Sequence, residues 1–154
     1  MIHVRHLRLL AFFLLLPVSS CSEETVGGVG TAVWTPQVLA SHPHDPAAFT
    51  QGLVYLDGEL YESTGLNGRS SLRRVELATG TVLDGVELAD VHFGEGLALV
   101  PASDRLVQLT WTSNTGFVYE RASLEQVDTF SYAGEGWGLT LDGLDVISPE
   151  HYER

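Results

Sequence analysis

Basic residues are scarce in this sequence. Lysine is absent, and eight arginines stand against 20 Asp and Glu residues, so that the 154-residue chain has a formal net charge of −12. Binding to nucleic acid or to an anionic lipid surface needs a basic patch, which so few cations do not provide. Without lysine, no side chain can form a Schiff base. We therefore expect no nucleic-acid partner.

Cysteine and long apolar runs are also nearly missing. Cys21 is the single cysteine, which excludes an intrachain disulfide. The apolar run 9–16 (LLAFFLLL) is too short to span a bilayer stably, and it follows Arg5 and Arg8. A short apolar core behind basic residues is typical of a signal peptide, which we place at residues 1–20.

The residues after this core indicate a lipid anchor. Small residues precede Cys21 in the segment 17–21 (PVSSC), which resembles a bacterial lipoprotein box in which the cysteine is lipidated and becomes the first mature residue. An ordinary signal peptide is the alternative. We expect an exported lipoprotein, periplasmic or on the cell surface, that touches the membrane only through Cys21, with residues 21–32 as a flexible tether.

Helical periodicity is missing from Val33 onward. Short β-type runs, broken by turn signals, take its place. Asp57-Gly58 between two such runs is a strong hairpin signal. The first set of expected strands is 53–56, 59–64, 71–77 and a fourth made by 81–83 and 86–88.

This set of strands repeats. An x-Gly-Leu core occurs at 51–53, 95–97 and 137–139, with glycines 44 and 42 residues apart. Residues 60–64 align with 106–110, and 72–77 with 117–122. A period of 40–45 residues with four strands predicts an all-β chain of β-propeller blades, each a four-stranded antiparallel sheet. A β-sandwich is the alternative, but it gives no reason for this fixed spacing.

The repeat also locates a candidate site. The first strand of each propeller blade lines the central channel, so the residue before each Gly-Leu is expected at one level around it. These residues are Gln51, Glu95 and Trp137. Their side chains, an amide, a carboxylic acid and an indole, differ, whereas the Gly-Leu that follows each of them is constant. This pattern predicts a functional site rather than three ordinary strand residues.

Five blocks carry a family resemblance. In chain order they are Phe49–Leu53 (FTQGL), Tyr61–Gly65 (YESTG), Phe93–Leu97 (FGEGL), Gln108–Trp111 (QLTW) and Glu135–Thr140 (EGWGLT). Over about residues 38–141 the chain resembles the plant- and bacterial-type glutaminyl-peptide cyclotransferases. The resemblance implies a five-bladed propeller that converts the N-terminal glutamine of a peptide or protein to pyroglutamate and releases ammonia. It also implies that catalysis needs no metal.

The resemblance assigns roles to four residues. Glu95 matches the catalytic glutamate, which we expect to move a proton from the attacking amine to the leaving nitrogen. Trp137 matches an active-site tryptophan that packs on the substrate side chain. Phe49 and Gln51 match substrate-contacting positions, and Gln51 suits the terminal amine or amide.

Other polar residues receive lesser roles. Glu62 and Trp111 lie in family motifs. We expect them to have structural roles or to pack against the substrate-contacting residues, without touching the substrate. Segment 42–45 (HPHD) has the residue types of a metal site, but Pro43 and Pro46 favour a solvated loop. His92 is read as a loop histidine, with a role in tuning Glu95 as the alternative. The sequence does not decide whether a structural calcium ion binds, and we expect no other cofactor.

The length of the chain leads to a further expectation. Five repeats of about 43 residues need roughly 215 residues, whereas 122 are left from Val33 onward. The family match stops near Gly143. We therefore expect residues 33–154 to be a partial cyclotransferase domain of fewer than three blades, inactive alone. The alternative functions are a non-catalytic peptide-binding propeller lipoprotein and a propeller enzyme of the quinone or lactonase kind.

Overall fold

The computed structural model describes residues 35–142 and 145–147. The predicted signal peptide, the lipidation site at Cys21 and the tether lie outside the described residues. The described part of the chain consists of ten strands with connecting turns and loops. It contains no helix with the length and apolar character needed to cross a membrane. The all-β prediction is confirmed.

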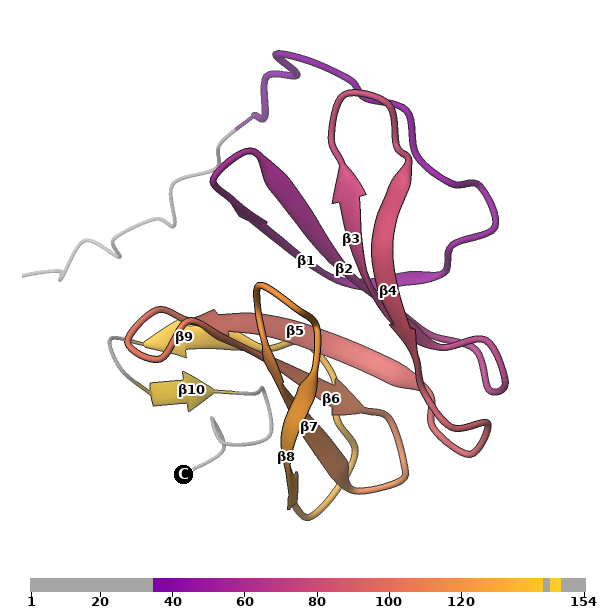
Figure 1. The fold of residues 1–154 in the computed structure, drawn as a ribbon, viewed down its shortest axis with the longest axis vertical. Coiled ribbons are helices and arrows are strands. Elements are labelled where there is room, and N and C mark those ends of the chain that lie inside the picture. Colours follow the sequence, from indigo (N-terminus) through magenta and orange to yellow (C-terminus); the bar gives the residue numbers. More distant parts are fainter. Residues whose placement is uncertain (1–34, 143–144, 148–154) are drawn as a thin grey trace, which may run out of the picture. The chain divides into compact units, whose positions relative to one another are not determined.

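The first sheet is an antiparallel meander of four strands in chain order (Figure 1). Its strands are β1 (Thr50–Leu56), β2 (Glu59–Thr64), β3 (Ser71–Glu76) and β4 (Val82–Glu87). The predicted segments 81–83 and 86–88 are joined in a single strand, β4, which covers all of them except Thr81 and Leu88 and shifts its register against β3 between Arg74 and Val75.

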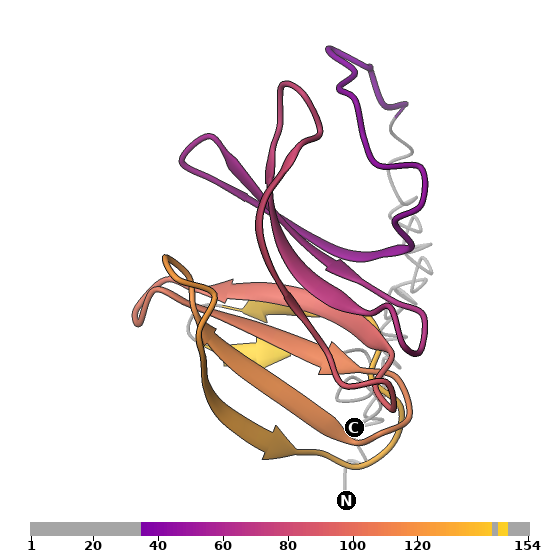
Figure 2. The same ribbon diagram turned by 45° about the vertical axis from the view of Figure 1, so that its right-hand side comes forward.

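The second sheet repeats this arrangement, as the turned view also shows (Figure 2). Its strands are β5 (Gly94–Val100), β6 (Arg105–Thr110), β7 (Thr115–Glu120) and β8 (Gln126–Ser131). A third, two-stranded sheet pairs β9 (Thr140–Asp142) with β10 (Asp145–Ile147). The predicted unit of four antiparallel strands is thus present twice.

The turn between β1 and β2 is the predicted Asp-Gly hairpin. Asp57 has a φ of 53° and Gly58 a φ of 89°. Two successive residues with positive φ are what a two-residue type I′ turn needs, because its twist matches that of the two strands. Leu56 pairs with Glu59 directly across the turn, so the hairpin also sets the register of both strands.

The predicted alignment of the third strands is wrong by one residue. Glu62 pairs with Arg73, and the corresponding Gln108 pairs with Phe117, so Phe117 corresponds to Arg73 and not to Leu72. A shift of one residue moves every side chain to the other face of the sheet. β3 carries buried side chains on both faces, and in β7 the apolar Val118 lies between Phe117 and Tyr119, so apolar character alone does not fix which face a residue lies on.

The core lies between the first two sheets. Buried side chains of both sheets form one cluster: Tyr61, Leu72, Leu88, Leu97, Leu106, Phe117, Tyr119 and Leu124. The fully buried Gln108 crosses this interface and donates to the Ser63 hydroxyl at 2.7 Å, while the Tyr119 hydroxyl donates to its amide oxygen at 3.1 Å. We call the face of the first sheet that carries Tyr61, Ser63 and Leu72 its inner face.

The x-Gly-Leu segments pack backbone against backbone. A Cβ atom on Gly52 would lie 2.6 Å from the Leu97 nitrogen, and one on Gly96 would lie 2.6 Å from the Leu139 nitrogen. Real Cβ atoms do not approach other atoms this closely, so both positions require glycine. The repeated glycines therefore let the first strands of successive repeats lie side by side.

We expect Gly52→Ala to destabilise the whole protein by about 1–3 kcal/mol, because the added methyl group overlaps the backbone of β5. Gly85→Ala is the matched control, since Gly85 lies on the exposed strand β4 and its Cβ would meet its nearest atom, the Leu72 carbonyl oxygen, only at 3.3 Å. Thermal unfolding measures both variants. Equal melting temperatures for the two would contradict the close approach.

Candidate functional site

Two β-bulges lie where the sequence places the site. The register of β1 shifts between Thr50 and Gly52, which leaves Gln51 without a cross-strand partner. The register of β5 shifts between Gly94 and Leu97, which leaves Glu95 and Gly96 without partners. Bulges interrupt the alternation of side chains and often aim one of them at a functional site. The sequence does not predict these bulges, because a bulge leaves no periodic signal.

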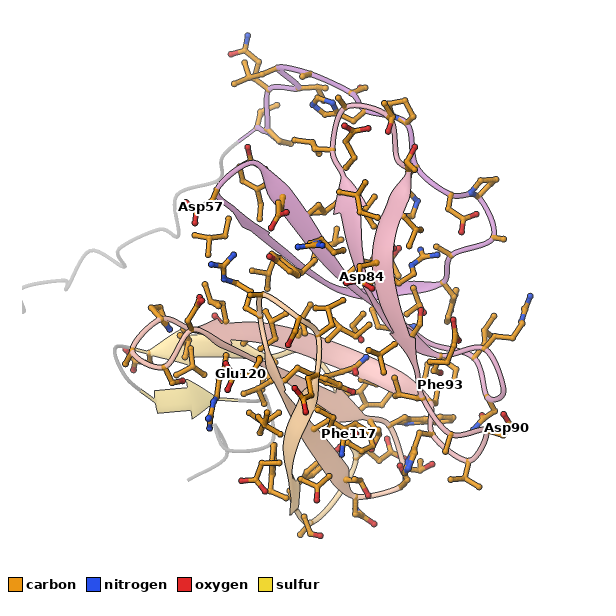
Figure 3. All side chains as sticks on the ribbon, viewed as in Figure 1. Asp57, Asp84, Asp90, Phe93, Phe117 and Glu120 are labelled. Carbon is orange, nitrogen blue, oxygen red and sulfur yellow. The ribbon has the colours of Figure 1, made fainter. Side chains whose placement is uncertain are left out.

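Four aromatic rings form a row across the repeats. Phe49 meets Phe93 with ring centroids 6.0 Å apart, Phe93 meets Trp111 at 5.8 Å, and Trp111 meets Trp137 at 6.1 Å. Phe93 lies on the segment that enters β5 (Figure 3). The other three side chains are 38–51% exposed. This aromatic row, as we call it, presents an open apolar surface.

Backbone hydrogen bonds hold the aromatic row. The Gly65 amide donates to the Phe49 carbonyl at 2.8 Å, and the Trp111 amide donates to the Phe93 carbonyl at 2.9 Å. These two bonds are equivalent in the first and second repeats. Because they fix the backbone beside Phe49, Phe93 and Trp111, this part of the row has a defined geometry although two of these three rings are exposed.

Glu95 is a buried carboxyl group. The residue is only 5% exposed, and burial raises the pKa of its side chain to about 7. Among the described residues its carboxyl group has no hydrogen bond or ion pair. The Gly96 amide donates to the Trp137 carbonyl at 2.9 Å, which ties the bulge of Glu95 to the end of the aromatic row. Glu95 is therefore poised to exchange a proton near neutral pH.

His92 does not act on Glu95 in this structure. Its Nδ1 lies 2.7 Å from the Ser113 hydroxyl, and its ring packs edge-on against Phe117 with centroids 5.1 Å apart. Figure 3 labels Phe117 on the second sheet. The raised pKa of Glu95 thus comes from burial and not from a neighbouring imidazole.

The predicted site residues fall into two groups. Phe49, Trp111 and Trp137 meet in the aromatic row, and Gln51 and Glu95 occupy equivalent bulges. Trp111, predicted as a supporting residue, is a full member of the row. Phe93 was not predicted, although it lies 44 residues after Phe49 and the repeat itself points to it.

Glu62 lies on the opposite face of the first sheet, which we call the outer face. Its side chain is buried, accepts a hydrogen bond from Arg73 and lies 2.8 Å from His44. Asp45 in turn accepts a hydrogen bond from Arg73 at 3.0 Å. Residues 42–45 form a largely exposed loop, as predicted, but the side chains of His44 and Asp45 also bind charged groups on the sheet.

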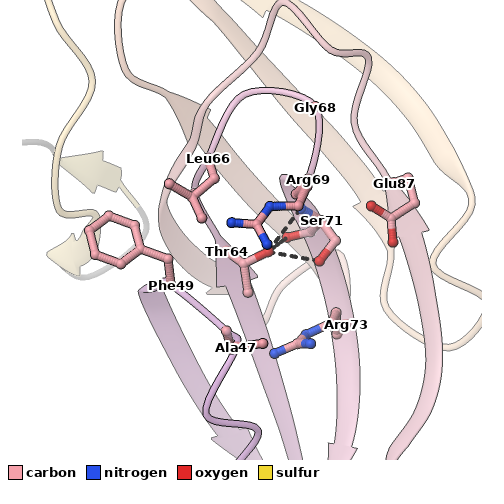
Figure 4. A pocket seen from close by; sticks show the side chains of 11 residues that line it. Ala47, Phe49, Thr64, Leu66, Gly68, Arg69, Ser71, Arg73 and Glu87 are labelled. Atoms are coloured by element: carbon pink, nitrogen blue, oxygen red, sulfur yellow. Dashed lines mark hydrogen bonds between the residues drawn. The ribbon is translucent and has the colours of Figure 1, made fainter.

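The outer face also carries a pocket of about 310 Å³ near Phe49 (Figure 4). Thr64, Ser71 and Arg73 are among its lining residues, and the Thr64 and Ser71 hydroxyls are hydrogen-bonded at 2.8 Å. Glu95 and Trp137 do not line it. Within the described part of the chain, no group of three His, Cys, Asp or Glu side chains could hold a metal ion.

Comparison with known proteins identifies the family. The family model described as glutamine cyclotransferase matches residues 9–150. The chain belongs to the glutamine cyclotransferase family. A glutaminyl-peptide cyclotransferase of Arabidopsis thaliana is 45% identical over 116 residues, which are 74% of this chain and 36% of the plant protein.

Similarity to a solved structure supports the same family and identifies the fold. The crystal structure of Myxococcus xanthus glutaminyl cyclase matches with a TM-score of 0.63 and 34% sequence identity, over 71% of this chain and 45% of that chain. The two four-stranded sheets are blades of a β-propeller. The chain spans less than half the length of either relative.

The buried carboxyl group of Glu95 should make the stability of this family member depend on pH. Because the pKa of Glu95 is raised on folding, the unfolded chain releases this proton first, and ionisation opposes folding as the pH rises through about 7. We expect Glu95→Gln to be more stable than the wild type at pH 8, by on the order of 2 kcal/mol, and equal to it at pH 4. Thermal unfolding at both pH values tests this, and a variant that is less stable at pH 8 would contradict it.

Proposed function

We propose that the whole protein to which these blades belong is a glutaminyl-peptide cyclotransferase. It converts the N-terminal glutamine of a peptide or protein to pyroglutamate and releases ammonia. The observation that carries this proposal is Glu95, a buried carboxyl group with a pKa raised to about 7, on a bulge tied to the aromatic row. The family membership supports the same reaction.

The reaction needs one group that both takes and gives a proton. The neutral α-amine of the substrate attacks the carbon of its own γ-carboxamide, a C–N bond forms, and the bond to the amide nitrogen breaks. Glu95, ionised at the start, takes a proton from the attacking nitrogen and returns it to the leaving nitrogen, which departs as ammonia. A pKa near the working pH suits both steps.

The aromatic row supplies binding rather than proton transfer. Its exposed rings offer an apolar surface on which the methylene groups of the glutamine side chain can pack. Gln51, on the neighbouring bulge, can hydrogen-bond the terminal amine or the carboxamide. Because both reacting groups belong to one residue, holding that residue in a folded conformation lowers the entropic part of the barrier.

The proposed reaction acts on one class of substrate and requires no cofactor. Proton transfer through a carboxyl group and attack by the substrate's own amine account for every bond that changes. The partner is a peptide or protein with a free N-terminal glutamine. The net charge of −12 and the absence of lysine fit this partner and do not favour nucleic acid.

Replacing Glu95 tests the function directly. We expect Glu95→Gln in the whole protein to slow the cyclisation of a Gln-peptide by at least ~10²-fold, because the amide keeps the shape but cannot move a proton. In the wild type, kcat should fall as the pH drops through about 7 and Glu95 takes up its proton. Ammonia release measured from pH 5 to 9 shows both effects.

Glu125→Gln is the matched control, since Glu125 is exposed in the turn between β7 and β8. It should leave turnover unchanged. Wild-type turnover in Glu95→Gln would remove Glu95 from the mechanism. Binding of Gln-peptides by the wild type without any ammonia release would instead favour the non-catalytic peptide-binding propeller.

We also propose that the protein is exported and anchored through a lipid on Cys21. The support is the sequence: basic residues, the apolar run 9–16, small residues, and then the single cysteine. Cys21→Ser should move the protein from the membrane fraction to the soluble exported fraction and abolish incorporation of labelled fatty acid. Membrane association that persists in this variant would count against the anchor.

A further inference from the structure

Glu62 is a second buried carboxylate with surroundings unlike those of Glu95. It is 0% exposed, and its Oε1 accepts a hydrogen bond from the Thr50 hydroxyl at 2.5 Å and lies 2.8 Å from His44 Nε2. Its Oε2 accepts a hydrogen bond from the Arg73 guanidinium at 2.5 Å. A buried charge with three partners has well-defined geometry, because each lost partner would leave it uncompensated.

The electrostatics of this cluster keep Glu62 ionised. Burial by itself raises the pKa of Glu62, but hydrogen bonds from Thr50, Arg73 and His44 outweigh burial and hold the pKa below its ordinary value. Arg73 also donates to Asp45 at 3.0 Å. The cluster therefore fastens the segment that leads into β1 to strands β2 and β3.

Thr50 connects this cluster to the proposed substrate site. It lies between Phe49, the first ring of the aromatic row, and Gln51, the residue of the β1 bulge. Phe49 accepts a backbone hydrogen bond from Gly65, but the bulge gives Gln51 no cross-strand partner. The hydroxyl of Thr50 is thus a side-chain anchor at the point where the ladder of β1 is interrupted.

The second sheet holds its bulge in another way. Gly94 stands at the position of Thr50, and its amide donates to the Ser70 hydroxyl at 3.0 Å. Gln108 stands at the position of Glu62, and it binds Ser63 across the interface. The second bulge is therefore fixed by the preceding sheet, whereas the first is fixed by a charged cluster of its own sheet.

We propose that Glu62 is a positioning residue that acts through Thr50 on Phe49 and Gln51. It holds the β1 bulge so that the ring of Phe49 and the amide of Gln51 face the N-terminal glutamine of the substrate. Arg73 and His44 keep Glu62 charged and in place, and Asp45 holds Arg73. The kinetic part of its test rests on the function proposed above. The positioning role itself rests on the contacts of Glu62 and Thr50 described in this subsection.

Thr50→Val is the sharpest test, because it removes only the hydroxyl and leaves Glu62 paired with Arg73 and His44. In the whole protein we expect KM for a Gln-peptide to rise about 3- to 10-fold with little change in kcat. Gln51→Ala should change the kinetics in the same direction. Thr50→Ser keeps the hydroxyl and should restore KM to within twofold of the wild-type value.

Thr79→Val is the matched control. Thr79 is exposed in the turn between β3 and β4, and its hydroxyl donates to Glu76 in the same way as Thr50 donates to Glu62. It should leave KM unchanged. A second readout needs no activity: amide hydrogen exchange of residues 48–53 should become several-fold faster in Thr50→Val and stay unchanged in Thr79→Val.

The outcomes separate this proposal from the proposed function. If the wild type cyclises no Gln-peptide but exchange rises in Thr50→Val alone, the function fails and the positioning role holds. If the wild type is active and Thr50→Val keeps KM within twofold, or lowers kcat alone, the positioning role is overturned. Unchanged exchange in Thr50→Val overturns it as well.

Discussion

The close approach of the x-Gly-Leu segments is the constraint on which the other features depend. Gly52 lies against the backbone of Leu97, and Gly96 lies against that of Leu139, at distances that no side chain allows. This contact sets the first strands of successive repeats side by side. The residue before each glycine then has a fixed place, and in the first two repeats that place is a bulge. The core between the sheets and the aromatic row follow from the same alignment.

Two buried glutamates show how surroundings decide the role of a side chain. Burial without a described partner raises the pKa of Glu95 to about 7. Glu62 is buried more completely, yet three hydrogen bonds hold its pKa below the ordinary value. The first can exchange a proton near neutral pH, whereas the second stays ionised and serves as an anchor. One residue type thus supplies a candidate acid–base group and a candidate positioning group in neighbouring repeats.

The two faces of the first sheet are held by different forces. The inner face packs apolar side chains against the second sheet, and its Ser63 accepts a hydrogen bond from the buried amide of Gln108. The outer face carries the Glu62–Arg73 ion pair, with His44 and Asp45 of the entering segment bound to it. Apolar packing tolerates small shifts, whereas hydrogen-bonded charges have one geometry. An ionic cluster is therefore well suited to fix the β1 bulge in one position.

Sequence alone determined the four-stranded repeat, the Asp57-Gly58 hairpin and the place of Glu95, because spacing, turn chemistry and repeated motifs are local signals. It misaligned β7 with β3 by one residue, since the consecutive apolar residues Phe117, Val118 and Tyr119 show no clear alternation. Only the tertiary structure decided the bulges, the addition of Phe93 to the aromatic row and the binding of His44 and Asp45 to the first sheet. These features join residues that are far apart in the chain, and the burial and pairing that set their chemistry exist only after the strands have packed.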